Sequence, residues 1–322
     1  MAHEVETMAY TNEVPWHGLG FSINKEEVSG QNGVENMMKA AKLDWNVSLE
    51  DIYRKNGEVI AEAKALIRST DEKVLSVVGR SYIPVQNSEA FAFFNEFVEA
   101  GEAHMETAGS LKGGRYVWGL ANLGESFSLK GGDKIKGYLL VGSPHEPGRS
   151  LIMKFTPVRV VCNNTLTMAL NWNSSKVHET GVSAPFARHT HRSLFDDAAL
   201  SQAKTTMGLA REQLAVFQEQ AKTLQGKSMT TQDAIDVLAP IFAPNFLGKM
   251  VEETASKKIR QLLDINRFAP GAQPGNAWGL LNAATYYLDH SAGRSQDNRL
   301  SSAWFGEGAA QKLKVLKVLL DA

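Results

Sequence analysis

The sequence predicts an α+β fold. An antiparallel sheet of hairpins packs against a helix in the first half, and helices alone form the C-terminal part. Three patterns lead to this fold class: alternating or β-branched segments over much of residues 59–161, an aromatic-rich helical pattern at 89–100, and helical periodicity after about residue 185. We expect two domains: an α+β domain over residues 1–184, with an N-terminal arm and a basic strand region, and a helical domain over residues 185–322.

The elements of the first half follow from apolar spacing and turn residues. Residues 33–43 space apolar groups as a helix does, and Ser88 is a suitable cap for the helix at 89–100. The segments 59–68 and 74–83 are typical of a hairpin. Further strands are expected at 104–111, 115–123, 135–142 and 149–161, with tight turns at Gly113-Gly114 and Gly131-Gly132 and a short capped helix at 163–170.

The second half is predicted to be helical throughout. Residues 193–225 have the spacing of one long helix, and Thr230 and Thr231 are good caps for a helix that ends near Leu238, before Pro240 breaks the pattern. Three more helices are expected at 250–264, 276–289 and 308–320.

The charge is balanced overall but unevenly distributed. The chain has 34 basic and 35 acidic residues, a net charge of −1, which excludes a globally basic nucleic-acid coat protein. Residues 1–107 hold 9 basic and 18 acidic side chains, whereas residues 108–192 hold 11 basic and 4 acidic ones. This middle stretch predicts a local positive surface, unless its charges are scattered or paired with the acidic first third.

Composition and the N-terminus indicate a soluble protein of a reducing compartment. The single cysteine excludes an intrachain disulfide framework and a cysteine-based zinc site. No apolar run approaches the ~18 residues of a membrane span, and the first twenty residues lack the layout of a signal peptide. We therefore expect no membrane partner and a location in the cytoplasm.

Catalytic and metal-binding residues are weakly indicated. Cys162 follows an apolar run and has no marked base, so a buried inert thiol is favoured over a nucleophile. In the turn-rich segment Pro15–Gly20, a core anchor is favoured over a functional His17. His189 and His191, with an arginine on either side, lack a third metal ligand. We expect no enzyme activity, no cofactor and no metal, and an enzyme using Cys162 or His17 is the weakest alternative.

The favoured interpretation is a nucleic-acid interface in the basic stretch. Cations at the turn after Gly109, followed by Tyr116 and Trp118 on one strand face, suit a groove that tracks phosphates and stacks bases, although these rings are equally suited to the core. The predicted nucleic-acid-binding residues are Lys112, Arg115, Tyr116, Trp118, Lys130, Lys134, Lys136, Arg149, Lys154 and Arg159.

Four separated motifs resemble those of the phage/plasmid-like protein family, a domain of unknown function found in bacteriophages and conjugative plasmids. The motifs are Pro15-Trp16-His17-Gly18-Leu19-Gly20, Gly109-Ser110-Leu111 with Gly114-Arg115, Val158 to Leu166, and Ala277 to Ala283 followed by Asp289-His290. The resemblance spans nearly the whole chain. It implies a mobile element and the cytoplasm of a bacterial host, and it supplies no catalytic residues.

The outline of the first half is also distantly similar to single-strand annealing proteins, which place DNA along a basic groove. We therefore expect a non-enzymatic protein that binds or anneals single-stranded DNA in phage or plasmid recombination or replication and forms a homo-oligomer. A phage or host replication or recombination protein is a further possible partner. The alternative is a protein–protein interaction factor that inhibits or redirects a host defence or replication protein.

Overall fold

The chain forms two compact units, each assembled from separate stretches. The computed structural model describes residues 5–11, 20–159, 164–165, 186–207, 210–246, 248, 250–269, 273–293, 299, 302–303 and 306–321. Unit 1 consists of residues 1–124, 138–155 and 185–210, and unit 2 of residues 125–137, 156–184 and 211–322. The units therefore differ from the two consecutive segments expected from the sequence.

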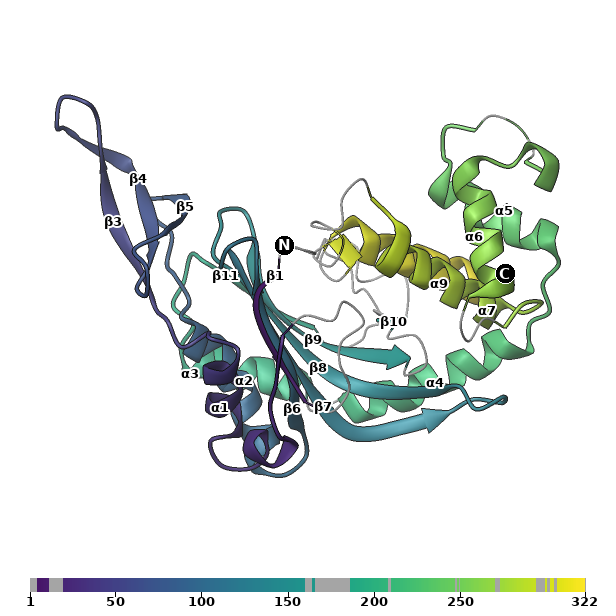
Figure 1. Cartoon of the computed structure of the whole chain (residues 1–322), viewed down its shortest axis with the longest axis horizontal. Coiled ribbons are helices and arrows are strands. Elements are labelled where there is room, and N and C mark those ends of the chain that lie inside the picture. Colours follow the sequence, from purple (N-terminus) through teal and green to yellow (C-terminus); the bar gives the residue numbers. More distant parts are fainter. Residues whose placement is uncertain are drawn as a thin grey trace. The chain divides into compact units, whose positions relative to one another are not determined.

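An eight-stranded sheet contains most of the predicted hairpins (Figure 1). Its strand order is β10-β9-β8-β7-β6-β1-β2, and β11 also pairs with β9. The strands are β1 (Val5–Tyr10), β2 (Phe21–Ser22), β6 (His104–Leu111), β7 (Tyr116–Ser128), β8 (Lys134–Pro144), β9 (Ser150–Arg159), β10 (Asn164–Thr165) and β11 (Phe186–Thr190). The predicted strands between residues 104 and 161 are thus confirmed, whereas Asn164 and Thr165, expected in a helix cap, lie in a strand.

The helices of unit 1 cover one face of this sheet (Figure 1). They are α1 (Gly33–Ala40), α2 (Asn87–Glu99) and α3 (Asp197–Met207), with the short 3-10 helix η2 (Lys25–Val28). Phe91 and Phe94 of α2 approach Gly119 so closely that a Cβ there would lie 2.9 and 3.1 Å from their rings. Glycine in β7 is therefore required by close packing of the helix on the sheet.

Helix α2 begins two residues earlier than predicted, at Asn87. Gln86, not Ser88, is the N-cap, and its backbone N–H donates to Glu89 Oε2 at 2.7 Å in a capping box. The Gln86 side chain also bonds the backbone of Val47, donating to the carbonyl at 3.0 Å and accepting from the N–H at 2.8 Å. This side chain therefore closes part of the edge of a second sheet.

That second sheet has three antiparallel strands, β3 (Val47–Tyr53), β4 (Val59–Arg68) and β5 (Val74–Gly79). The hairpin of β4 and β5 is confirmed. The strand β3 was not predicted, because the mixed polar sequence VSLEDIY gives little alternation. It is a strand because it pairs with β4 over most of its length.

The helices of unit 2 follow the predicted pattern with two corrections. They are α4 (Ala210–Gly226), α5 (Thr231–Phe242), α6 (Lys257–Phe268), α7 (Ala277–Tyr286) and α9 (Glu307–Asp321), with the 3-10 helix η4 (Glu252–Thr254) and the π-helical turn η5 (Tyr287–Ser291). The long helix predicted at 193–225 is α3 and α4, which belong largely to different units. Helix α5 continues past Pro240, and the Ala243 N–H still donates to the Ala239 carbonyl at 2.8 Å.

Candidate nucleic-acid interface

The turn between β6 and β7 presents two of the predicted cations in unit 1. Lys112, Gly113 and Gly114 all have positive φ, at 54°, 66° and 88°, so the chain reverses in a tight hairpin. Arg115 is exposed and its Nε donates to the Lys112 carbonyl at 3.2 Å. As the sequence predicted, the turn joins two strands of a hairpin. It is therefore not a phosphate-binding loop of the kind that leads from a strand into a helix.

Two arginines outside this turn, Arg68 and Arg149, are paired with carboxylates, whereas Lys112 and Arg115 form no ion pair within the described residues. Arg68 donates to Glu6 and to Asp71 through several bonds of 2.6 to 3.0 Å. The hydrogen bond from Arg68 lowers the pKa of Asp71 to about 2. The predicted phosphate-binding residue Arg149 is itself paired with Glu146 at 2.6 Å. A phosphate would have to compete with this carboxylate for Arg149.

Tyr116 and Trp118 are not exposed stacking surfaces. Gly119 packs against α2, so strand alternation places both rings on the opposite face of the sheet. Each is nevertheless only 1% exposed, and burial raises the pKa of Tyr116. A base cannot stack on either ring in this conformation, which corrects that part of the prediction.

Lys154 is also buried, with 4% of its surface exposed, so the structure does not present it to a phosphate. This corrects the prediction that Lys154 binds a phosphate. The residue lies on β9, an inner strand with a paired neighbour on each side, and its side chain points into the interior. Arg159 ends β9, and its side chain lies outside the described residues. His17 and Cys162 lie outside them too.

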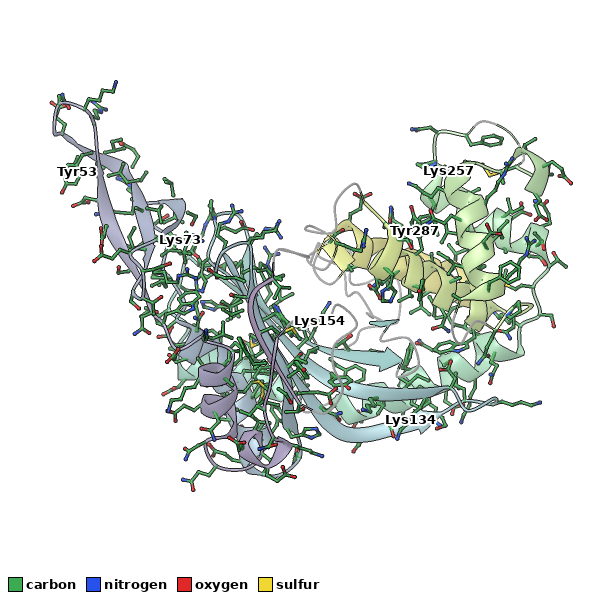
Figure 2. The ribbon with its side chains drawn as sticks, viewed as in Figure 1. Tyr53, Lys73, Lys134, Lys154, Lys257 and Tyr287 are labelled. Carbon is green, nitrogen blue, oxygen red and sulfur yellow. The ribbon has the colours of Figure 1, made fainter. Side chains whose placement is uncertain are left out.

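The turn between β7 and β8, in unit 2, presents the other three lysines. Lys130 and Lys134 are exposed and Lys136 is half-buried (Figure 2 labels Lys134). The Leu129 N–H donates to the Asp133 carbonyl at 2.8 Å and closes the turn. Its two central glycines have φ of 97° and 82°, a conformation that a side chain at these positions would strain.

The lysine turn, the segment from Lys130 to Lys136, is bound by two side chains from other segments of unit 2. The Gln225 side chain donates to the Lys130 carbonyl at 2.7 Å and accepts from the Lys130 N–H at 3.2 Å, as a neighbouring strand would. The buried indole of Trp278 donates to Asp133 Oδ2 at 2.8 Å. Because Asp133 is only 3% exposed, the acidic residue of the turn points away from solvent.

The acidic side chain of the turn therefore makes no ion pair with its lysines. Within the described residues, none of Lys130, Lys134 and Lys136 forms an ion pair. The structure thus divides the predicted cations between two units: Lys112, Arg115, Arg149 and Lys154 lie in unit 1, and Lys130, Lys134 and Lys136 in unit 2.

A buried histidine pair in unit 1 was not identified as a site from the sequence. His145 is fully buried, and its Nε2 bonds Asn87 Oδ1 at 2.9 Å. The Asn87 amide nitrogen donates to two backbone carbonyls, so its oxygen faces the histidine and requires the Nε2–H tautomer. The ring of His191 stacks on Tyr82 with centroids 4.5 Å apart. Burial, followed by the charge of His191, lowers the pKa of His145 to about 3.

Two further features bear on possible functions. The described residues contain no group of three or more His, Cys, Asp or Glu side chains that is arranged to hold a metal ion. Among the helices in the described ranges, none combines the length and the apolar character needed to cross a bilayer.

The fold and the lysine turn define an α+β protein with a cationic hairpin turn that hydrogen bonds hold in place. The chain belongs to the family described as Domain of unknown function (DUF932), which matches residues 74–304. No curated protein and no solved structure matched the chain.

Proposed function

We propose that this protein binds nucleic acid without catalysing a reaction, with single-stranded DNA as its principal ligand. The role would be binding or annealing in the recombination or replication of a phage or plasmid, in the cytoplasm of a bacterial host. The observation that carries the proposal is the lysine turn of Lys130, Lys134 and Lys136, whose one carboxylate is directed inward at Trp278. Cations without counter-ions are the feature that phosphate backbones bind.

The rigidity of the turn supports phosphate binding beyond simple charge. Binding costs conformational entropy, because lysine side chains and the backbone that carries them become ordered. A turn whose backbone is already held by hydrogen bonds loses less of this entropy when a ligand binds. Gln225 and Trp278 fix both sides of the turn before any ligand arrives. The lysine turn would contact phosphates and not base edges, so binding would depend strongly on salt and weakly on sequence.

A fluorescence anisotropy titration tests the proposal directly. A labelled single-stranded oligonucleotide is titrated with the protein at several salt concentrations, beside the same strand annealed to its complement. Each phosphate contact to a single strand contributes about 0.7 to the slope of log affinity against log salt. Replacing Lys130, Lys134 and Lys136 together by glutamine should therefore lower the slope by about 2.

A charge-matched variant separates a local site from a general charge effect. Lys55→Gln, Lys314→Gln and Lys317→Gln together remove three exposed lysines from other elements. We expect this variant to keep a slope close to that of the wild type. Absence of wild-type binding at micromolar protein and low salt would remove the proposal, and equal losses in both variants would remove the lysine turn as the site.

A protein partner is the second candidate function, and exposed apolar side chains on the three-stranded sheet favour it. Tyr53 and Val59 lie directly opposite each other on β3 and β4 and are 60% and 46% exposed, and Val74 and Val77 of β5 are each 54% exposed. Apolar surface of this kind is typical of interaction sites. A pull-down from bacterial lysate, with and without nuclease treatment, distinguishes the two candidate functions. A protein that stays bound in stoichiometric amount after nuclease treatment favours a protein partner. Proteins that are lost after nuclease treatment favour nucleic-acid binding.

A further inference from the structure

Nucleic-acid binding to single strands usually combines phosphate contacts with an aromatic ring on which a base stacks. Tyr116 and Trp118 are buried and cannot provide that ring. Among the described large apolar side chains, Phe268 of unit 2 has the greatest exposure, 80%. It therefore offers a ring face that solvent already reaches.

The position of Phe268 on α6 explains its exposure. Ile259, Leu262 and Leu263 form the buried side of the helix. At 3.6 residues per turn, the nine residues from Ile259 to Phe268 rotate the side chain by about 180° to the opposite face. The ring therefore lies on the solvent side of the helix and is not part of the core.

Phe268 is close in the chain to Gln273, a residue that contacts the support of the lysine turn. Gln273 accepts a hydrogen bond from Gln225 at 3.1 Å, and Gln225 binds the Lys130 backbone. A Cβ placed on Gly131 would lie 3.9 Å from the Gln273 amide nitrogen. Four residues lie between Phe268 and Gln273, so the five chain steps limit their Cα atoms to about 18 Å apart.

Two arginine side chains of α6 bind η4 near Phe268. Arg267 at the end of α6 binds Glu252 of η4 at 2.8 Å, with both side chains partly exposed. The Arg260 side chain donates to the Glu253 carbonyl at 2.8 Å, which holds η4 against α6. The end of the helix therefore presents Phe268 on a fixed support.

We infer that Phe268 is the base-stacking residue of a single-strand site whose phosphates bind Lys130, Lys134 and Lys136. This inference rests on the proposed function and specifies its ligand as a strand with unpaired bases. A duplex keeps its bases stacked inside and would gain nothing from this ring.

The test compares Phe268→Ala and Phe268→Trp with the wild type in the same anisotropy titration. Phe268→Ala should weaken single-strand binding by about 5- to 150-fold, because loss of one stacked base has effects of this size. The salt slope should stay unchanged, since no phosphate contact is lost. Phe268→Trp keeps an aromatic ring and should bind as the wild type does. The fluorescence that the new tryptophan adds to that of the wild type should be quenched by the oligonucleotide.

Tyr53→Ala, which removes an exposed ring from unit 1, is the matched control and should bind as the wild type does. Because Phe268 is exposed, its truncation leaves the core intact, which far-UV circular dichroism verifies. If Phe268→Ala binds like the wild type while the triple-lysine variant is impaired, the stacking role is overturned and the proposed function stands. If the wild type binds no oligonucleotide at low salt, both fail.

Discussion

Acidification should open unit 1 because its buried histidines must be neutral in the folded state. The ordinary pKa of histidine is 6.5, and in this fold burial lowers that of His145 to about 3. The unfolded chain therefore binds a proton that the folded chain does not, and stability falls as the pH drops below 6.5. The loss continues down to about pH 3, at about 1.4 kcal/mol per pH unit.

The size of the effect can be worked out for a practical pH range. Between pH 7 and pH 5, His145 alone should lower the free energy of unfolding of its surroundings by about 2 kcal/mol. His191, whose pKa burial also lowers, adds to the loss in the same direction. A change of this size is a large part of the stability of a typical domain.

His145→Gln removes the titrating group and keeps a side-chain N–H for Asn87 Oδ1. Amide hydrogen exchange of the peptides containing residues 82–91 reports local opening. Comparing wild type and variant at one pH cancels the intrinsic exchange rate. The ratio of wild-type to variant protection should fall about 25-fold from pH 7 to pH 5. A ratio that stays constant over this range would refute the reasoning.

Two predictions concern packing and charge in the same unit. Gly119→Val should destabilise the protein by about 1–3 kcal/mol, because the valine side chain would overlap Phe91. Gly79→Val is the control and should change the stability little, because a side chain there meets open space. Urea unfolding measures the stability of both variants. Arg68→Met should cost about 3 kcal/mol in the same assay, because it leaves the Glu6 carboxylate without its main partner. Adding Glu6→Gln should recover part of that loss, and a double variant as unstable as the single one would contradict the explanation.

Local patterns were sufficient for most of the elements. Alternation predicted four strands of the eight-stranded sheet, β6 to β9, but not β1, β2, β10 or β11. The paired glycines marked the turns that join β6 to β7 and β7 to β8, since positive φ is a local requirement. Helical periodicity found α1, α2 and the helices of unit 2. The strand β3 was missed because a polar strand is defined by its partner and not by its own sequence.

The site was predictable in part. The concentration of cations between residues 108 and 192 is a property of the sequence, and so is the hairpin position of Lys130 and Lys134. Phe268 carried no signal beyond its spacing from Ile259, which places it opposite the apolar side of α6. Its proposed link to the lysine turn depends on Gln225 and Gln273, which meet only in the folded chain.

The sequence by itself determined the α+β class, the hairpins, the helical C-terminal part and the number of basic residues in the middle stretch. Only the tertiary structure decided which cations lie in the same unit, that Asp133 turns toward Trp278, and that Tyr116 and Trp118 are covered. The reason is physical: alternation fixes which side chains share a face, but the burial and pairing of that face depend on segments distant in the chain.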